Sequence, residues 1–167
     1  DEQAFALGSA YISKNNKGVI TRRAPMKAIM PAYMFAGTGI VDAVIPASVT
    51  YLEADGVFAN CADLETVTFQ AATLTYTYLG NYLFYNCDSL VDIVIPKSNS
   101  TNPFNSKIGY TFAECDNLET VTVYYKAGSG SSGGITIVAA TNPTAGHMFE
   151  NCKSLKDLIL YDTTSPI

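Results

Sequence analysis

The cysteines carry the most versatile chemistry in the sequence, because thiolates can bind metals, form disulfides or act as nucleophiles. None of them belongs to a C-x-x-C pair, and each occupies the same position of a repeated pattern: Cys61, Cys87, Cys115 and Cys152. A metal site needs ligands that converge on one point, whereas equivalent side chains of stacked repeats point the same way. On distance alone, a disulfide between the cysteines of neighbouring repeats remains possible, since stacked repeats lie about 5 Å apart. We expect a ladder of free, buried thiols and no metal site, and Thr38 at the same position of another repeat agrees with this.

His147 is the only histidine, which excludes paired-histidine metal sites and leaves a single imidazole base. Its equivalents in the other repeats are mostly aromatic: Tyr33, Gly56, Tyr82 and Tyr110. This pattern indicates a surface position of aromatic size, and we assign no catalytic residue. The glycine cluster at 128–134 lacks the G-K-[ST] of a phosphate-binding loop, and Asp55-Gly56 lacks the alternating acidic residues of a calcium loop. No cofactor is expected.

Length and charge narrow the function classes. The chain has 167 residues, the size of one domain, and a net charge of -5 with no run of Lys or Arg. Such a surface does not neutralise a row of phosphates, so nucleic acid is not an expected partner. No stretch of about 18 apolar residues is present, so no membrane insertion by this segment is expected.

A twelve-residue pattern, F-x-x-C-x-x-L-x-x-[VIL]-x-[VIFL], determines the expected fold. It occurs without gaps at 58–69, 84–95, 112–123 and 149–160, and a degenerate fifth copy at 35–45 has Thr38 at the cysteine position. Apolar spacing of three is typical of a tight helical or 3₁₀ turn, and spacing of two is typical of a strand with one buried face. A strand this short needs neighbours, so each should pair in parallel with its equivalent in the next repeat.

These features predict a β-rich solenoid, a right-handed coil with a parallel sheet and short 3₁₀ or helical turns. The leucine and phenylalanine positions should form two buried columns: Leu64, Leu90, Leu118 and Leu155, and Phe58, Phe84, Phe112 and Phe149.

The repeats resemble the BspA-type leucine-rich repeat over roughly residues 29–161. Ile45-Pro46 and Ile95-Pro96 close two strands as in that family, and Leu79-Gly-Asn-Tyr-Leu-Phe84 leads into a third repeat. Members are mostly bacterial surface or secreted proteins, some of which act in adhesion. The resemblance implies a secreted or cell-surface protein, with any signal peptide removed, that works as a binding module. It implies no particular ligand.

The expected organisation is a single domain in three parts. Residues 1–28 do not fit the repeat and should cap the first core layer, with a turn at Asn15–Gly18. Five repeats follow over 29–161, with insertions at 97–107 and 126–146. Residues 162–167 should form a short polar tail.

The outward face of the sheet is the expected binding surface. Strand residues alternate, so two columns point outward: Asp42, Thr66, Asp92, Thr120 and Asp157, and Val44, Thr68, Val94, Thr122 and Ile159. From these columns and their flank we select as candidate binding residues Thr66, Thr68, Asp92, Val94, Thr120, Thr122, Tyr124 and Asp157. A hydroxyl-rich, acidic face of this kind suits a protein or glycan ligand.

Three other interpretations stay open. β propensity alone accounts for branched residues on exposed strands. The repeats could instead be structural spacers within a longer surface protein. A hydrolytic enzyme would need titratable groups that converge in a pocket, whereas the columns put such groups in rows.

Overall fold

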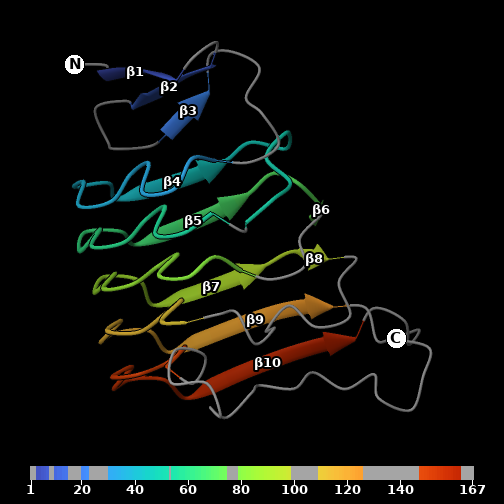
Figure 1. Cartoon of the computed structure of the whole chain (residues 1–167). Helices are drawn as coiled ribbons and strands as arrows, with labels where there is room; N and C mark the ends of the chain where they lie inside the picture. Colours follow the sequence, from blue (N-terminus) through green and yellow to red (C-terminus); the bar gives the residue numbers. More distant parts are fainter. Residues whose placement is uncertain are drawn as a thin grey trace.

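The computed structural model of the chain describes residues 3–7, 10–14, 20–22, 30–52, 54–74, 79–98, 109–125 and 147–162. The strands are β1 (Gln3–Leu7), β2 (Ala10–Lys14), β3 (Ile20–Arg22), β4 (Asp42–Ile45), β5 (Thr66–Phe69), β6 (Thr73–Leu74), β7 (Asp92–Ile95), β8 (Lys97–Ser98), β9 (Thr120–Tyr125) and β10 (Asp157–Asp162). Among the described residues there is no helix. Strands β4, β5, β7, β9 and β10 lie one after another along the stack (Figure 1).

The first three strands form an antiparallel sheet in the order β1-β2-β3, and β3 lies beside β4 (Figure 1). This is the segment in which the sequence predicts a cap, and capping of the first core layer stays a prediction. The predicted turn at Asn15–Gly18 lies outside the described residues, as does the stretch 126–146.

In each described repeat, the segment between the repeat phenylalanine and the following strand consists of tight turns rather than a 3₁₀ helix. Hydrogen bonds between residues three apart are present, as in Cys61 N–H to Phe58 C=O at 3.2 Å and Leu64 N–H to Cys61 C=O at 3.0 Å. A left-handed residue interrupts these turns, since Asn60 has a φ of 59°. A 3₁₀ helix requires negative φ throughout, so the expectation of 3₁₀ or helical turns is wrong in detail.

The left-handed residues recur two positions before and two positions after the repeat phenylalanine. They are Tyr33, Gly37, Gly56, Asn60, Tyr82, Asn86, Tyr110, Glu114 and Asn151. Glycine adopts this conformation without strain, but the Cβ of any other residue at position 56 would collide with the ring of Tyr33, whose Cε1 would lie only 2.2 Å away. The absence of a side chain at Gly56 therefore leaves the space that the ring of Tyr33 occupies.

The predicted phenylalanine and leucine columns form the core. Successive phenylalanine rings stack with centroids 5.5 Å apart from Phe35 through Phe149. Phe58, Phe84 and Phe112 are at most 1% exposed, and Leu64, Leu90 and Leu118 are fully buried. Phe149 and Leu155 of the last described rung are only partly buried. The two columns are confirmed.

Parallel pairing has the predicted register, but the sheet is not continuous. β4 pairs with β5 (Asp42 with Thr66), β7 pairs with β9 (Asp92 with Thr120), and β9 pairs with β10 (Thr120 with Asp157). No ladder joins β5 to β7 in the described part of the chain. The expectation that every strand pairs with its equivalent in the next repeat is therefore wrong at this one step. The fold class itself is the predicted one: β-rich leucine-rich repeats stacked through parallel strands.

Two predicted boundaries also shift. Lys97 and Ser98 open the predicted loop 97–107 but form β8, which pairs in parallel with β6. Asp162, predicted to begin the tail, is the last residue of β10. Residues 99–108 and 163–167 lie outside the described residues.

Candidate binding site

The split between β5 and β7 has a cause in the lengths of two neighbouring repeats. Phe58 and Phe84 stack ring on ring and are 26 residues apart, whereas the paired residues Thr73 and Lys97 are 24 apart. The earlier repeat therefore holds two more residues between its strands than the later one. Three residues, 70–72, join β5 to β6, but Pro96 alone joins β7 to β8. The segment 70–72 must therefore accommodate two residues that have no counterpart in the next repeat.

Pro96 contributes a second cause. Gln70 follows β5 directly, and its N–H donates to the C=O of Ile45 at 2.9 Å. Pro96 follows β7 at the equivalent place and has no N–H to offer. The C=O of Phe69 therefore lacks the donor that its equivalent, Ile45, receives.

The split is confined to a short window on the strand side of the stack. On the turn side the same two repeats stay joined through Gly56 N–H to Asn81 C=O (2.8 Å) and Phe58 N–H to Leu83 C=O (2.9 Å). Before the window, Ser89 N–H donates to Ala62 C=O at 3.1 Å, and after it β6 pairs with β8. The opening therefore extends only along β5 and β7.

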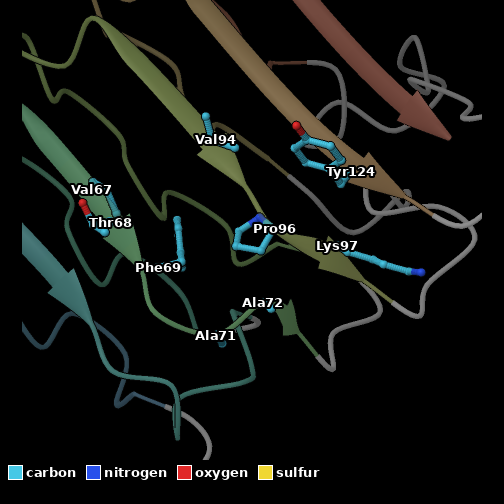
Figure 2. Close-up of a pocket in the computed structure, with 9 residues that line it drawn as sticks. All are labelled: Val67, Thr68, Phe69, Ala71, Ala72, Val94, Pro96, Lys97 and Tyr124. Carbon is cyan, nitrogen blue, oxygen red and sulfur yellow. The ribbon is translucent and has the colours of Figure 1, made fainter. Parts of the chain in front are cut away.

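A pocket of about 580 Å³ occupies this window. Figure 2 shows its lining: Val67, Thr68, Phe69, Ala71, Ala72, Val94, Pro96, Lys97 and Tyr124. Most of this surface is apolar, and Lys97 is the only charged residue in the lining. A concave, mainly apolar surface with a few polar groups is typical of ligand sites.

Val67 and Phe69 show how the split changes the core. Their side chains belong to the inward-facing set of β5, yet both are only partly buried. The equivalent residues Ile93, Ile95, Val121 and Val123 are at most 2% exposed. Two side chains that elsewhere complete the core therefore form a pocket wall.

The structure divides the candidate residues predicted from sequence. Thr68, Val94 and Tyr124 line the pocket, and Val94 is 52% exposed. Thr120, which begins β9 in the same column as Thr66 and Asp92, is half-buried. Thr122, on β9 between β7 and β10, is only 9% exposed and so offers little surface to a ligand. The remaining candidates lie at the starts of their strands, away from the pocket lining: Thr66, Asp92 and Asp157.

The pocket residues that the sequence analysis did not select are Val67, Phe69, Ala71, Ala72, Pro96 and Lys97. The signal for them was present in the sequence, in the unequal repeat lengths and in Pro96.

Charges are separated along the sheet face. Acidic residues begin three strands, with Asp42 accepting a hydrogen bond from Thr66 Oγ1 at 2.5 Å. Glu119 pairs with Lys156 at 2.8 Å in the same end region. Lys97 lies beyond the carboxyl end of β7, and no ion pair to it is present among the described residues.

The four cysteines form no disulfide, and their thiols are hydrogen-bonded. Each cysteine Sγ donates a hydrogen bond to the backbone C=O of the phenylalanine one repeat earlier. The pairs are Cys61 to Phe35 (3.0 Å), Cys87 to Phe58 (3.2 Å), Cys115 to Phe84 (3.0 Å) and Cys152 to Phe112 (2.9 Å). Three are buried, but Cys152 is only partly so, which corrects the expectation that all four are buried. A hydrogen bond to Cys115, together with burial, holds the pKa of the Cys87 thiol far above its usual range.

His147 lies in an aromatic stack at the turn side. Its ring centroid is 4.8 Å from that of Tyr110, which stacks on Tyr82 at 5.1 Å, and its Nδ1 is 2.5 Å from a carboxylate oxygen of Glu150. Burial, with Glu150 as a smaller contribution, raises the pKa of the Tyr110 hydroxyl. Within the described ranges, no group of three or more His, Cys, Asp or Glu side chains could hold a metal ion.

Comparison with known proteins agrees with this architecture. The family model described as BspA type leucine rich repeat region (6 copies) matches residues 28–133. A crystal structure of a leucine-rich cell surface protein from Faecalibacterium prausnitzii resembles the chain with a TM-score of 0.59 at 22% identity, over 94% of this chain and 39% of that one. The chain thus spans well under half of that protein.

A leucine-rich repeat protein from Bacteroides capillosus has 18% identity and a TM-score of 0.40, over 72% of this chain and 97% of that one. No curated protein matches the chain. In the described part of the chain, no helix has the length and apolar character needed to cross a membrane. The family and fold are typically non-catalytic and support a binding or structural module. On the family match over residues 28–133, the chain belongs to the BspA-type leucine-rich repeat family.

Proposed function

We propose that the chain is a non-catalytic binding module of a secreted or cell-surface bacterial protein, and that it binds a protein or glycan ligand through its sheet face. The pocket between β5 and β7 carries this proposal, because a purely structural stack has no use for a break that exposes core side chains. The Faecalibacterium protein that the chain resembles is a leucine-rich cell surface protein, which supports the location.

The surface around the pocket is suited to binding without large rearrangement. Val94 and Tyr124 project from paired strands of one rigid sheet, so little conformational entropy is lost when a ligand contacts them. Tyr124 is further held by stacking on Tyr161, with ring centroids 5.0 Å apart. Adhesion is the role in a cell-surface protein that such a face would serve.

A matched pair of variants tests the proposal. Val94 and Ile159 occupy equivalent positions two strands apart, both are exposed, and only Val94 lines the pocket. Val94→Asp should abolish binding to whichever ligands wild type captures on arrays of glycans and extracellular proteins, because a bound ligand would cover the new charge beside the apolar pocket walls. Ile159→Asp should bind like wild type. If both variants bind like wild type, or both fail equally, the pocket is not the binding site.

A further inference from the structure

We infer that the ligand of this pocket is an acidic sugar residue of a glycan, a pyranose ring that carries a carboxylate. Its ring would pack against the free face of Tyr124, and its carboxylate would meet Lys97 at the rim. The inference rests on the proposed function, because it names the chemical class of ligand for the same pocket. Four properties of the pocket lead to it: its width, its aromatic wall, its unpaired polar groups and the placement of charge.

The width of the pocket excludes an extended peptide inserted as a further strand. Several Cα atoms of β5 lie within 8 Å of Cα atoms of β7, whereas a chain paired on both sides needs two strand spacings, about 9.6 Å. Hydrogen bonds from Ser89 to Ala62 and between β6 and β8 hold the two repeats together at both ends of the window. The occupant is therefore a compact group, and a volume of about 580 Å³ is in the usual range for small-molecule sites.

The aromatic wall is one face of Tyr124. The other face of this ring stacks on Tyr161 of β10, with the two planes 15° apart. Because β7 lies on the opposite side of β9 from β10, the free face of the ring is turned toward β7 and the pocket. The C–H groups on one side of a pyranose are apolar and slightly positive, so they pack well on the negative face of an aromatic ring. Val94 and Pro96 extend this wall with further apolar surface.

Unpaired polar groups favour a polyol over a purely apolar ligand. Adjacent residues of a parallel ladder direct their backbone groups to opposite sides. Thr120 N–H donates to Val91 C=O at 3.2 Å, so Val94, an odd number of residues further on, directs its backbone groups toward β5. No backbone hydrogen bond joins β5 to β7 among the described residues. Sugar hydroxyls both donate and accept, so they can meet the Val94 backbone and the hydroxyls of Thr68 and Tyr124.

Charge selects an acidic sugar. Lys97 is half-buried and is the only charged residue of the lining. Figure 2 shows its side chain extending beyond Pro96, with the nitrogen directed away from the apolar walls. A ligand whose ring lies on the wall can therefore place a carboxylate at the Lys97 nitrogen without bringing the charge onto apolar surface. Asp92, at the start of β7, lies at the other end of the window from this contact.

A protein side chain matches the lining less completely than an acidic sugar does. A single side chain carries either an apolar ring or a carboxylate, so it would meet either Tyr124 or Lys97 but not both. An acidic pyranose combines an apolar face, hydroxyl groups and a carboxylate in one rigid unit. The observations therefore favour a glycan over a protein as the source of the ligand.

The test is an NMR titration of the full chain with two acidic sugars, the methyl glycosides of glucuronic acid and of N-acetylneuraminic acid. Each has a twin in which a carboxamide replaces the carboxylate. For wild type we expect an acid to bind in the millimolar range and about fivefold more tightly than its amide, because a charge-assisted contact is lost in the amide. The acid that binds more tightly identifies the source as a uronic acid or a sialic acid.

Variants separate the two contacts. Lys97→Gln should reduce the preference for acid over amide to within about twofold, and Lys97→Arg should retain it. Lys156→Gln changes a lysine at the other end of the strands, paired with Glu119, and should behave as wild type. Tyr124→Ala should weaken acid and amide alike, because it removes the wall on which both pack. The same spectra show whether each variant is folded.

Equal binding of acids and amides to wild type would overturn carboxylate recognition. Absence of binding by all of these sugars in the millimolar range would overturn the inference as a whole. If a protein on the array then bound in a manner that Val94→Asp abolished, the proposed function would stand without it. If no ligand responded to Val94→Asp, both would fall.

Discussion

The Sγ atom of Cys115 lies 3.0 Å from the carbonyl oxygen of Phe84, one repeat earlier in the stack, and donates a hydrogen bond to it. Both residues are fully buried, so this contact satisfies a carbonyl that water does not reach. The same contact recurs at the other cysteines. The cysteine position thus selects a small side chain that carries a donor, which accounts for cysteine without any redox or metal chemistry.

Replacing this donor should destabilise the stack more than its size alone implies. Cys115→Ala leaves the Phe84 carbonyl buried without its thiol partner, and we expect a loss of about 1 to 3 kcal/mol in the free energy of unfolding. Cys115→Ser keeps a donor at the same place and should lose less. Urea unfolding followed by circular dichroism measures both. An alanine variant as stable as the serine variant would show that the thiol hydrogen bond contributes nothing.

The leucine column should dominate stability. Leu118 is fully buried in the middle of the described stack, so Leu118→Ala should cost about 2 to 5 kcal/mol through lost burial and the cavity it leaves. Leu160, which is 37% exposed, is the control, and truncating it should cost much less. Thermal melts of both variants test this order. Similar melting temperatures for the two would contradict the column as the main source of stability.

Thiol labelling should distinguish Cys152 from the other three. It is the only partly buried cysteine, so a small alkylating reagent should modify it first, while the rest stay protected until denaturant is added. Burial, with a smaller contribution from Cys115, raises the pKa of the Cys152 thiol to about 12. Because only the thiolate reacts, its labelling rate should keep rising with pH beyond 9, where a free cysteine levels off.

Mass spectrometry of labelled peptides resolves the four sites. Faster modification of Cys87 or Cys115 than of Cys152 would contradict the burial of the thiol ladder. A Cys152 profile that levels off near pH 9, in a protein that circular dichroism shows to be folded, would contradict the raised pKa.

The split in the sheet should be visible in amide hydrogen exchange. Val94 N–H faces the window without a ladder partner, whereas Thr122 N–H faces β7 within the β7–β9 ladder. We therefore expect the Val94 amide to exchange much faster than that of Thr122, although the two residues occupy equivalent positions. Heteronuclear NMR spectra recorded after transfer to deuterium oxide measure both rates. Equal protection would mean that β5 and β7 are paired in solution.

The fold was predictable from sequence because each apolar position recurs in several repeats and the register follows from their alignment. Leu64, Leu90 and Leu118 fall into one buried column for this reason. The site was predictable only in part. The alternation of side chains along a strand correctly predicts that Thr68 and Val94 point outward. It makes no distinction, however, between one pair of neighbouring strands and another.

The features that the alternation of side chains does not predict arise from differences between neighbouring repeats. Phe69 belongs to the inward set by pattern, and only the two extra residues before β6, together with the missing N–H of Pro96, leave it at a pocket wall. Thr122 is outward by pattern but nearly covered, because whether an outward side chain is exposed depends on the sizes of the side chains around it. Residue periodicity contains neither piece of information.

A difference of two residues in the length of adjacent repeats is a small genetic change, and in this chain it accompanies a pocket without altering the hydrogen bonds that hold the same repeats together on their turn side. Repeat arrays change by duplication and by short insertions or deletions, and each boundary between units is a place where such a mismatch can arise. Recognition in an array of this kind can therefore evolve by altering spacing at one boundary while the core-forming residues of every unit stay as they are. Shortening the segment 70–72 by two residues would erase the site, and a comparable insertion elsewhere would create a new one further along the array.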